Sequence, residues 1–172
     1  MERVKGHSLW LIPEGRVYTY LEGIVHELSK RCSSPLFIPH MTFIPELEIS
    51  RKDIIYKTNE LIKMIAPFSV KLTVLDYLDA YYQCLFAKAE ETQELIVANL
   101  KARKIFNRKD SKWTPHLSLL YGHLTSEQKE QIISDIGGRA FNCEFQVNKI
   151  HLFSTEGGPD DWYKVKEFLI KK

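Results

Sequence analysis

The sequence predicts an α+β fold in which two similar lobes, each an antiparallel sheet backed by helices, line a central cleft. The first observation is a repeat. The order strand–helix–strand–helix–strand occurs over roughly 7–78 and again over 81–153, and one more strand is expected at 162–170. The second observation is a motif, Pro-His-x-Thr/Ser, which occurs once in each repeat with its two histidines 76 positions apart. No linker-like stretch divides the repeats, so we expect residues 1–172 to form one bilobal domain.

The composition is that of an ordinary globular protein, and it excludes several classes of function. Hydrophobic residues make up 44% and charged residues 27% of the chain, and the net charge of +2 is too small for a protein that coats DNA. No apolar run approaches the ~20 residues that cross a bilayer, and the apolar stretch near the start is too short for a secretory signal. The three cysteines are widely spaced and suit free thiols. We therefore expect a cytoplasmic protein that does not associate with membranes.

The elements of the first repeat follow from local patterns. Short apolar runs closed by proline or glycine predict strands, and apolar residues at intervals of three or four predict helices with one buried face. Ser50 followed by Asp53 is typical of a helix start, because the serine caps free N–H groups and the acid complements the dipole. In order, the repeat comprises strand 7–12, helix 16–31, motif strand 36–44, a helix that opens at Ser50 and ends before Pro67, and the alternating strand 68–74.

The second repeat has the same order of elements. Thr125 with Gln128 forms a capping-box pattern at the start of its second helix, and Gly137 with Gly138 ends that helix. In order, this repeat comprises strand 81–87, helix 91–106, motif strand 115–121, helix 125–135 and a strand around 143–153, after which the C-terminal strand 162–170 follows a glycine-rich loop.

The two motifs place a histidine and a hydroxyl on one face of a strand. Residues two apart in a strand project to the same side, so His40 points with Thr42, and His116 points with Ser118. The apolar residues between them face the helices. If the repeats are related by a pseudo-twofold axis, the two polar faces confront one another across the cleft.

This set of side chains suits phosphoryl chemistry. Cleavage of a cyclic phosphodiester needs a base that deprotonates water and an acid that protonates the departing ribose oxygen, and histidine suits both tasks at neutral pH. Two positioned hydroxyls can donate hydrogen bonds to the charged oxygens of the transition state. We therefore predict that His40 and His116 are catalytic and that Thr42 and Ser118 bind the phosphate.

These histidines have two other interpretations. A single imidazole on an apolar strand is more often a core residue than a catalyst, but the recurrence of the whole motif favours function. A metal site would require a third or fourth ligand, and the sequence has no His-x-x-x-His or Cys-x-x-Cys cluster. We expect neither a metal nor another cofactor.

The sequence also resembles a known group of proteins. The segments "PLFIPHMTFIPEL" and "PHLSLLYGHLTSEQKEQI" are similar to the paired His-x-Thr/Ser strands of the two-histidine (2H) phosphoesterase superfamily, and are most like cyclic nucleotide phosphodiesterases of the plant and yeast type. The resemblance covers nearly the whole chain and implies a bilobal fold with a water-filled cleft and no metal. It further implies hydrolysis of nucleoside 2′,3′-cyclic phosphates and of ADP-ribose 1″,2″-cyclic phosphate, which arises in RNA processing.

The resemblance also assigns roles to individual residues. It implies that His116 acts as the base toward water and His40 as the acid toward the leaving oxygen, although the sequence leaves the reverse order open. Tyr121 matches a tyrosine that lines the family's site. Strict alternation would turn Tyr121 to the other face, so this role requires the strand to end or bulge there.

Three further residues are candidates for contacts with the substrate at the edge of the site. Trp10 is a candidate for stacking a base or sugar, with a core position equally open, and Tyr82 and Gln83 are candidates for the rim.

The expected partner is a small nucleotide or an RNA with a cyclic phosphate end, and we expect a monomer without an obligate protein partner. One alternative function is a 2′–5′ RNA ligase-like phosphodiesterase that acts on RNA ends. Another is an idle RNA- or nucleotide-binding module.

Overall fold

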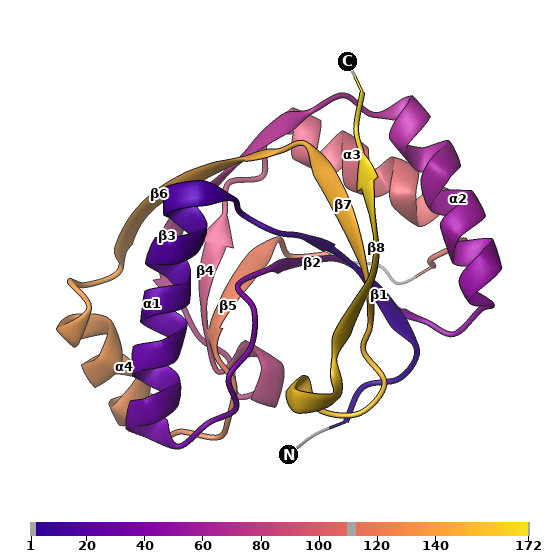
Figure 1. Ribbon diagram of the computed structural model, residues 1–172. Coiled ribbons are helices and arrows are strands. Elements are labelled where there is room, and N and C mark those ends of the chain that lie inside the picture. Colours follow the sequence, from indigo (N-terminus) through magenta and orange to yellow (C-terminus); the bar gives the residue numbers. More distant parts are fainter. Residues whose placement is uncertain (1–2, 110–112, 172) are drawn as a thin grey trace.

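One strongly curled antiparallel sheet forms the centre of the protein (Figure 1). The computed structural model describes residues 3–109 and 113–171, and within these ranges eight strands and four α-helices confirm the predicted α+β class. In chain order the elements are β1 (His7–Leu11), α1 (Gly15–Cys32), β2 (Met41–Leu47), α2 (Arg51–Met64), β3 (Phe68–Asp76), η1 (Tyr81–Gln83), β4 (Leu85–Ala89), α3 (Gln93–Ile105), β5 (His116–Leu120), α4 (Ser126–Asp135), β6 (Ala140–Val147), β7 (Lys149–Ser154), η2 (Pro159–Asp161) and β8 (Tyr163–Leu169).

The strand order joins the two expected sheets into one. The order is β6-β3-β4-β5-β2-β1-β7-β8, with the two motif strands β2 and β5 side by side at the middle. A single registered pair, Met41 opposite Leu117, connects the two four-stranded halves. The motifs are therefore neighbours within one sheet rather than partners across a gap between two sheets.

Each half of the sheet combines strands from both repeats. β3, from the first repeat, lies beside β4, and β7, from the second, lies beside β1. This differs from the expected division into lobes made by residues 7–78 and 81–153. The physical reason is that β1 pairs with β2, and β4 with β5, which leaves the outer edges of these pairs for strands that arrive from the other repeat. Asn148 alone separates β6 from β7, so this stretch runs from one half of the sheet to the other.

The helices cover the outer, convex side of the sheet and leave the concave side open (Figure 1). α1 packs against β5 and β6, α3 packs against β2 and β3, and α2 lies against α3 and β8. The apolar residues between the motif positions point toward these helices, as the alternation predicts. All four are completely buried: Met41, Phe43, Leu117 and Leu119.

The predicted helix starts are confirmed at the level of single hydrogen bonds. The Ser50 hydroxyl accepts from the backbone N–H of Asp53 at 3.1 Å, and Thr125 with Gln128 forms the complete capping box. The strand expected over 81–87 begins later, because Tyr81–Gln83 form a 3₁₀ turn before β4.

The state of the cysteines agrees with the sequence expectation. Cys32, Cys84 and Cys143 are all free thiols. None of the helices in residues 3–109 and 113–171 combines the length and the apolar character that crossing a membrane requires.

Candidate active site

The antiparallel register of β2 and β5 brings the four polar motif residues together. Met41 lies opposite Leu117, and both side chains face the helices. One step along each strand places His40 opposite Ser118 and Thr42 opposite His116, on the concave face. Each histidine therefore has the hydroxyl of the other motif as its cross-strand neighbour.

A cavity of about 750 Å³ opens on this concave face. Its volume lies within the ~300–1,000 Å³ that small-molecule sites usually occupy. All eight residues that the sequence predicted for the site line this cavity: Trp10, His40, Thr42, Tyr82, Gln83, His116, Ser118 and Tyr121. The structure therefore gathers positions that are more than 100 residues apart in the chain.

The backbone fixes the tautomer of both histidines in the same way. Nδ1 of His40 lies 2.6 Å from the carbonyl oxygen of Ile38, and Nδ1 of His116 lies 2.8 Å from that of Thr114. A carbonyl oxygen can only accept, so each Nδ1 carries the proton and each Nε2 is left as the basic nitrogen. The Gln83 side-chain amide lies 3.4 Å from Nε2 of His116 and donates to it.

Burial shifts the protonation of both rings toward the neutral form. His40 is only 4% exposed, and burial, with a smaller contribution from His116, lowers the pKa of His40 from 6.5 to about 4, against the opposing effect of the Ile38 carbonyl. Burial also lowers the pKa of His116, while its bond to the Thr114 carbonyl acts in the opposite direction. Both imidazoles are therefore neutral near pH 7.

Each histidine rests on an aromatic ring from the neighbouring strand. Trp10 lies opposite Thr42, and Phe86 lies opposite Ser118 at the matching position of the other half. The Trp10 indole stacks on His40 with ring centroids 3.6 Å apart, and Phe86 lies 4.9 Å from His116 at an interplanar angle of 58°. The two repeats are therefore also alike in having an aromatic side chain at the position that supports each imidazole.

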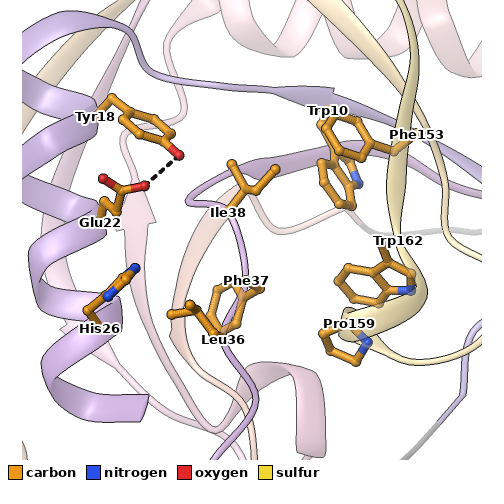
Figure 2. Close-up of a pocket in the computed structure, with 10 residues that line it drawn as sticks. All are labelled: Trp10, Tyr18, Glu22, His26, Leu36, Phe37, Ile38, Phe153, Pro159 and Trp162. Atoms are coloured by element: carbon orange, nitrogen blue, oxygen red, sulfur yellow. Dashed lines mark hydrogen bonds between the residues drawn. The ribbon is translucent and has the colours of Figure 1, made fainter. Parts of the chain in front are cut away.

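Trp10 lines the cavity but is almost completely enclosed by other rings. The side chain is 2% exposed, and besides His40 it stacks on Phe153 at 4.0 Å, with Trp162 at its edge (Figure 2). A ring so enclosed has no free face for a base. Of the two positions that the sequence left open for Trp10, the structure favours the core one, in which the indole supports the imidazole of His40.

The opposite side of the site is built by η1 and the end of β5. The Ser118 hydroxyl donates to the carbonyl oxygen of Tyr82 at 2.9 Å. β5 ends at Leu120, so Tyr121 is released from the strand alternation and enters the cavity. Tyr121 stacks on Phe37 at 3.7 Å, and its burial raises the pKa of the phenol, although a hydrogen bond with Ser118 opposes that shift.

The cavity also contains residues that the sequence did not single out. Trp113 donates its indole N–H to the backbone oxygen of Thr42 at 3.2 Å, and Trp162 meets the Tyr121 ring edge-on. Lys88 lies opposite His116 in the β4–β5 ladder. Phe86 also lines the cavity, and for this residue the sequence contained a signal: the offset of 76 positions that relates the two histidines also relates Trp10 to Phe86. For Trp162 we find no comparable signal.

A smaller cavity of about 210 Å³ lies beyond the tryptophans (Figure 2). Trp10 and Trp162 line both cavities. Its opposite wall is α1, where the Tyr18 hydroxyl donates to the Glu22 carboxylate at 2.8 Å. Among the residues that the structure describes, no cluster of three His, Cys, Asp or Glu side chains is arranged to hold a metal ion.

A pair of antiparallel His-x-Thr/Ser strands at the centre of a curled sheet is the arrangement that defines the two-histidine (2H) phosphoesterases, and this fold and site place the chain in that class. More narrowly, the chain belongs to the family of cyclic phosphodiesterase-like proteins, whose family model matches residues 5–166.

Individual relatives agree with this assignment. The cyclic phosphodiesterase of Arabidopsis thaliana is 22% identical to this chain over 162 residues, which cover 91% of the chain and 90% of the relative. The apo form of E. coli LigT matches with a TM-score of 0.69 and 14% identity, over 99% of this chain and 100% of LigT. TT0787 of Thermus thermophilus matches with a TM-score of 0.67 and 17% identity, over 96% and 97% of the two chains. At such identities the solved structures establish the shared fold.

Proposed function

We propose that the chain is a metal-independent cyclic phosphodiesterase that hydrolyses nucleoside 2′,3′-cyclic phosphates, ADP-ribose 1″,2″-cyclic phosphate or both, with two histidines as general acid and base. One observation carries this function: two neutral imidazoles and two hydroxyls share the concave face of adjacent strands, with both Nδ1 atoms bound to carbonyls. Both Nε2 atoms are thereby left unprotonated, with that of His116 beside the Gln83 amide, and a phosphate group can lie between them. Membership of the cyclic phosphodiesterase-like family supports the same class of reaction.

The proposed reaction needs two proton transfers and one displacement at phosphorus. Water attacks the phosphorus atom and gives a proton to Nε2 of one histidine. The bond from phosphorus to one ribose oxygen breaks, and that oxygen takes a proton from the other histidine. The product is a phosphate monoester with a free ribose hydroxyl. Thr42 stabilises the charge that develops on the non-bridging oxygens, and Ser118 does so once its hydroxyl turns from the Tyr82 carbonyl toward them.

The order implied by the resemblance assigns water activation to His116 and the leaving oxygen to His40. His116 suits the base, because its lowered pKa keeps Nε2 unprotonated near pH 7. In this order the bound phosphate anion has to raise the pKa of His40 from about 4 before that ring can act as the acid.

The reverse order is a second candidate that a specific observation favours. His40 is the more deeply buried ring, and a pKa of about 4 describes a group that is fully deprotonated near neutrality, as a base must be. His116 would then carry the proton for the leaving oxygen on Nε2, and the Gln83 amide would turn its oxygen toward that N–H to orient the ring. The two orders differ in which histidine variant a better leaving group rescues.

Whether the substrate is a small nucleotide or an RNA end depends on the surface around the cleft. E. coli LigT has been solved in complexes with phosphate and with 3′-AMP, which supports a nucleotide-sized ligand for this fold. A binder of long RNA would present free cations beside the cavity. Two basic residues of the segment 101–109 instead bind backbone oxygens: Lys101 that of Met64, and Arg108 that of Pro45. These two bonds and the ligands of LigT support small cyclic phosphates as the substrates.

The test is an assay of purified protein after treatment with EDTA. The panel contains adenosine 2′,3′-cyclic phosphate, ADP-ribose 1″,2″-cyclic phosphate and an RNA oligomer ending in a cyclic phosphate. We expect hydrolysis of the small substrates that chelation leaves unchanged, and phosphorus NMR of the products identifies the broken bond. Activity that vanishes with EDTA and returns with zinc or manganese would refute metal-independent catalysis.

A further inference from the structure

We propose that Lys88 forms a second anion subsite beside His116, which binds a phosphate group of the substrate other than the one that reacts. This inference rests on the proposed function. It makes cyclic phosphates with an additional phosphate the preferred substrates over simple nucleoside cyclic phosphates.

The position of Lys88 in the sheet separates it from the reacting phosphate. Lys88 lies opposite His116 in the β4–β5 ladder, on the concave face, and it lines the large cavity. A phosphate that touches both imidazoles must lie over β2 and β5. β4 is on the far side of β5 from β2, one strand spacing of about 4.8 Å away from His116. The Lys88 ammonium is therefore placed to reach the part of the substrate that extends away from His40.

The charge of the cavity wall points to the same residue. Lys88 is the single lysine or arginine among the described residues that line the large cavity. The acids in this wall are Asp76 and Glu46, and Glu46 belongs to β2, on the other side of the histidines. Among the residues that the structure describes, an additional phosphate on the substrate thus has one cationic partner in this wall, and that partner lies on the β4 side.

The ion pair that Lys88 now makes does not prevent this use. Its Nζ bonds to one carboxylate oxygen of Asp76, while the guanidinium of Arg139 lies 3.8 Å from the other. Arg139 remains beside Asp76 when the ammonium turns toward a phosphate, so the carboxylate is not left without a cation. The Lys88 side chain is 44% exposed and has room to move.

The position equivalent to Lys88 in the other half of the sheet carries no charge, so a second phosphate can bind on one side only. The offset that relates the two histidines places Ile12 at the position of Lys88. The two imidazoles are nearly equivalent by symmetry, but a substrate with a second phosphate is bound in one orientation, with that phosphate over β4.

The experiment compares substrates that differ by one phosphate. The pair is adenosine 2′,3′-cyclic phosphate and its 5′-phosphorylated form. ADP-ribose 1″,2″-cyclic phosphate and a ribodinucleotide with a cyclic phosphate end show whether a diphosphate or an internucleotide phosphate is the preferred source. Lys88→Met keeps the aliphatic stem and removes the charge, Lys88→Arg restores a cation, and Lys149→Ala removes an ion-paired lysine that does not line the cavity.

For the wild type we expect a higher kcat/KM on the phosphorylated member of the pair. A charge-assisted hydrogen bond to a partly exposed ammonium corresponds to a preference of about tenfold at low salt, which falls as ionic strength rises. Lys88→Met should abolish the preference by raising KM for the phosphorylated substrate much more than for adenosine 2′,3′-cyclic phosphate. Lys88→Arg should retain most of the preference, and Lys149→Ala should retain all of it.

Two results would overturn the subsite. One is a wild type that hydrolyses both members of the pair with equal kcat/KM. The other is a Lys88→Met variant that loses activity on both substrates by the same factor. Failure of the proposed function has a different signature, because the wild type would then hydrolyse neither member of the pair.

Discussion

The imidazole of His40 lies parallel to the indole of Trp10, with ring centroids 3.6 Å apart and 13° between the planes. Phe153 stacks on the same indole at 4.0 Å, so the imidazole stands on two layers of aromatic rings. Together with the bond from Nδ1 to the Ile38 carbonyl, this stack leaves the ring a single orientation. Much of the precision of the site therefore resides in residues that touch the imidazole and not the substrate.

Replacement of Trp10 tests this support directly. Trp10→Phe keeps an aromatic surface under His40, and we expect kcat to stay within about threefold of wild type. Trp10→Leu leaves the imidazole without a flat partner, and we expect kcat to fall about tenfold or more with little change in KM, since misplacement of a catalytic group acts on the chemical step. Circular dichroism and the urea midpoint control for folding. Equal activity of the two variants would contradict the positioning role.

Removal of either imidazole should nearly silence the enzyme. We expect His40→Ala and His116→Ala each to lower kcat by about 10²–10⁴-fold, the usual contribution of a general acid or base. A cyclic substrate with sulfur in place of the leaving ribose oxygen distinguishes the two, because a thiolate leaves without a proton. The variant that lacks the acid regains most of its rate on this substrate, whereas the variant that lacks the base does not. Rescue of neither would argue against a division of acid and base between these rings.

Loss of one hydroxyl should have a smaller effect than loss of an imidazole. Thr42→Val keeps the shape of the side chain and removes one hydrogen-bond donor, for which we expect a loss of about 10–100-fold in kcat/KM. Ser118→Ala should cost at least as much, since Ser118 also connects the Tyr82 carbonyl with Tyr121. An unchanged rate in both variants would show that these hydroxyls do not contact the reacting phosphate.

Acid should destabilise the protein in a defined pH range. The folded protein holds the pKa values of His40, His116 and His151 below 6.5, mainly through burial, so the unfolded chain binds protons more readily. Stability is therefore complete above about pH 6.5 and falls as the pH decreases. For His40 alone, a pKa of about 4 corresponds to on the order of 3 kcal/mol of unfolding free energy between pH 7 and pH 4. Urea unfolding at a series of pH values measures this slope.

His151 offers a control that lies outside the site. It is opposite Trp10 in the β1–β7 ladder, is 6% exposed, and its Nδ1 is buried without a hydrogen-bond partner among the described residues. We expect His151→Leu to lessen the pH dependence of the unfolding free energy by the share of this one ring, while activity near pH 7 is kept. A slope as steep as that of the wild type would mean that His151 makes no contribution to the acid sensitivity.

Local patterns were sufficient to predict most of the helices and strands and the two His-x-Thr/Ser pairs of the site. The caps at Ser50 and Thr125 are confirmed because a cap depends on residues three positions apart. The sharing of one face by His40 with Thr42, and by His116 with Ser118, likewise needs only the period of two in a strand. The burial of Trp10 was beyond such reasoning, since an aromatic residue on a strand serves equally as core or as a binding surface.

The sequence by itself determined which side chains the site has, because the identity of a residue and its face on a strand are set within a few positions of the chain. Only the tertiary structure decided which residues become neighbours: that β3 and β7 change halves, that Trp10 lies beneath His40, and that Lys88 lies beside His116. Strand pairing joins residues distant in sequence, and its register is set by the packing of the whole sheet against the helices. No short window of the chain contains that information.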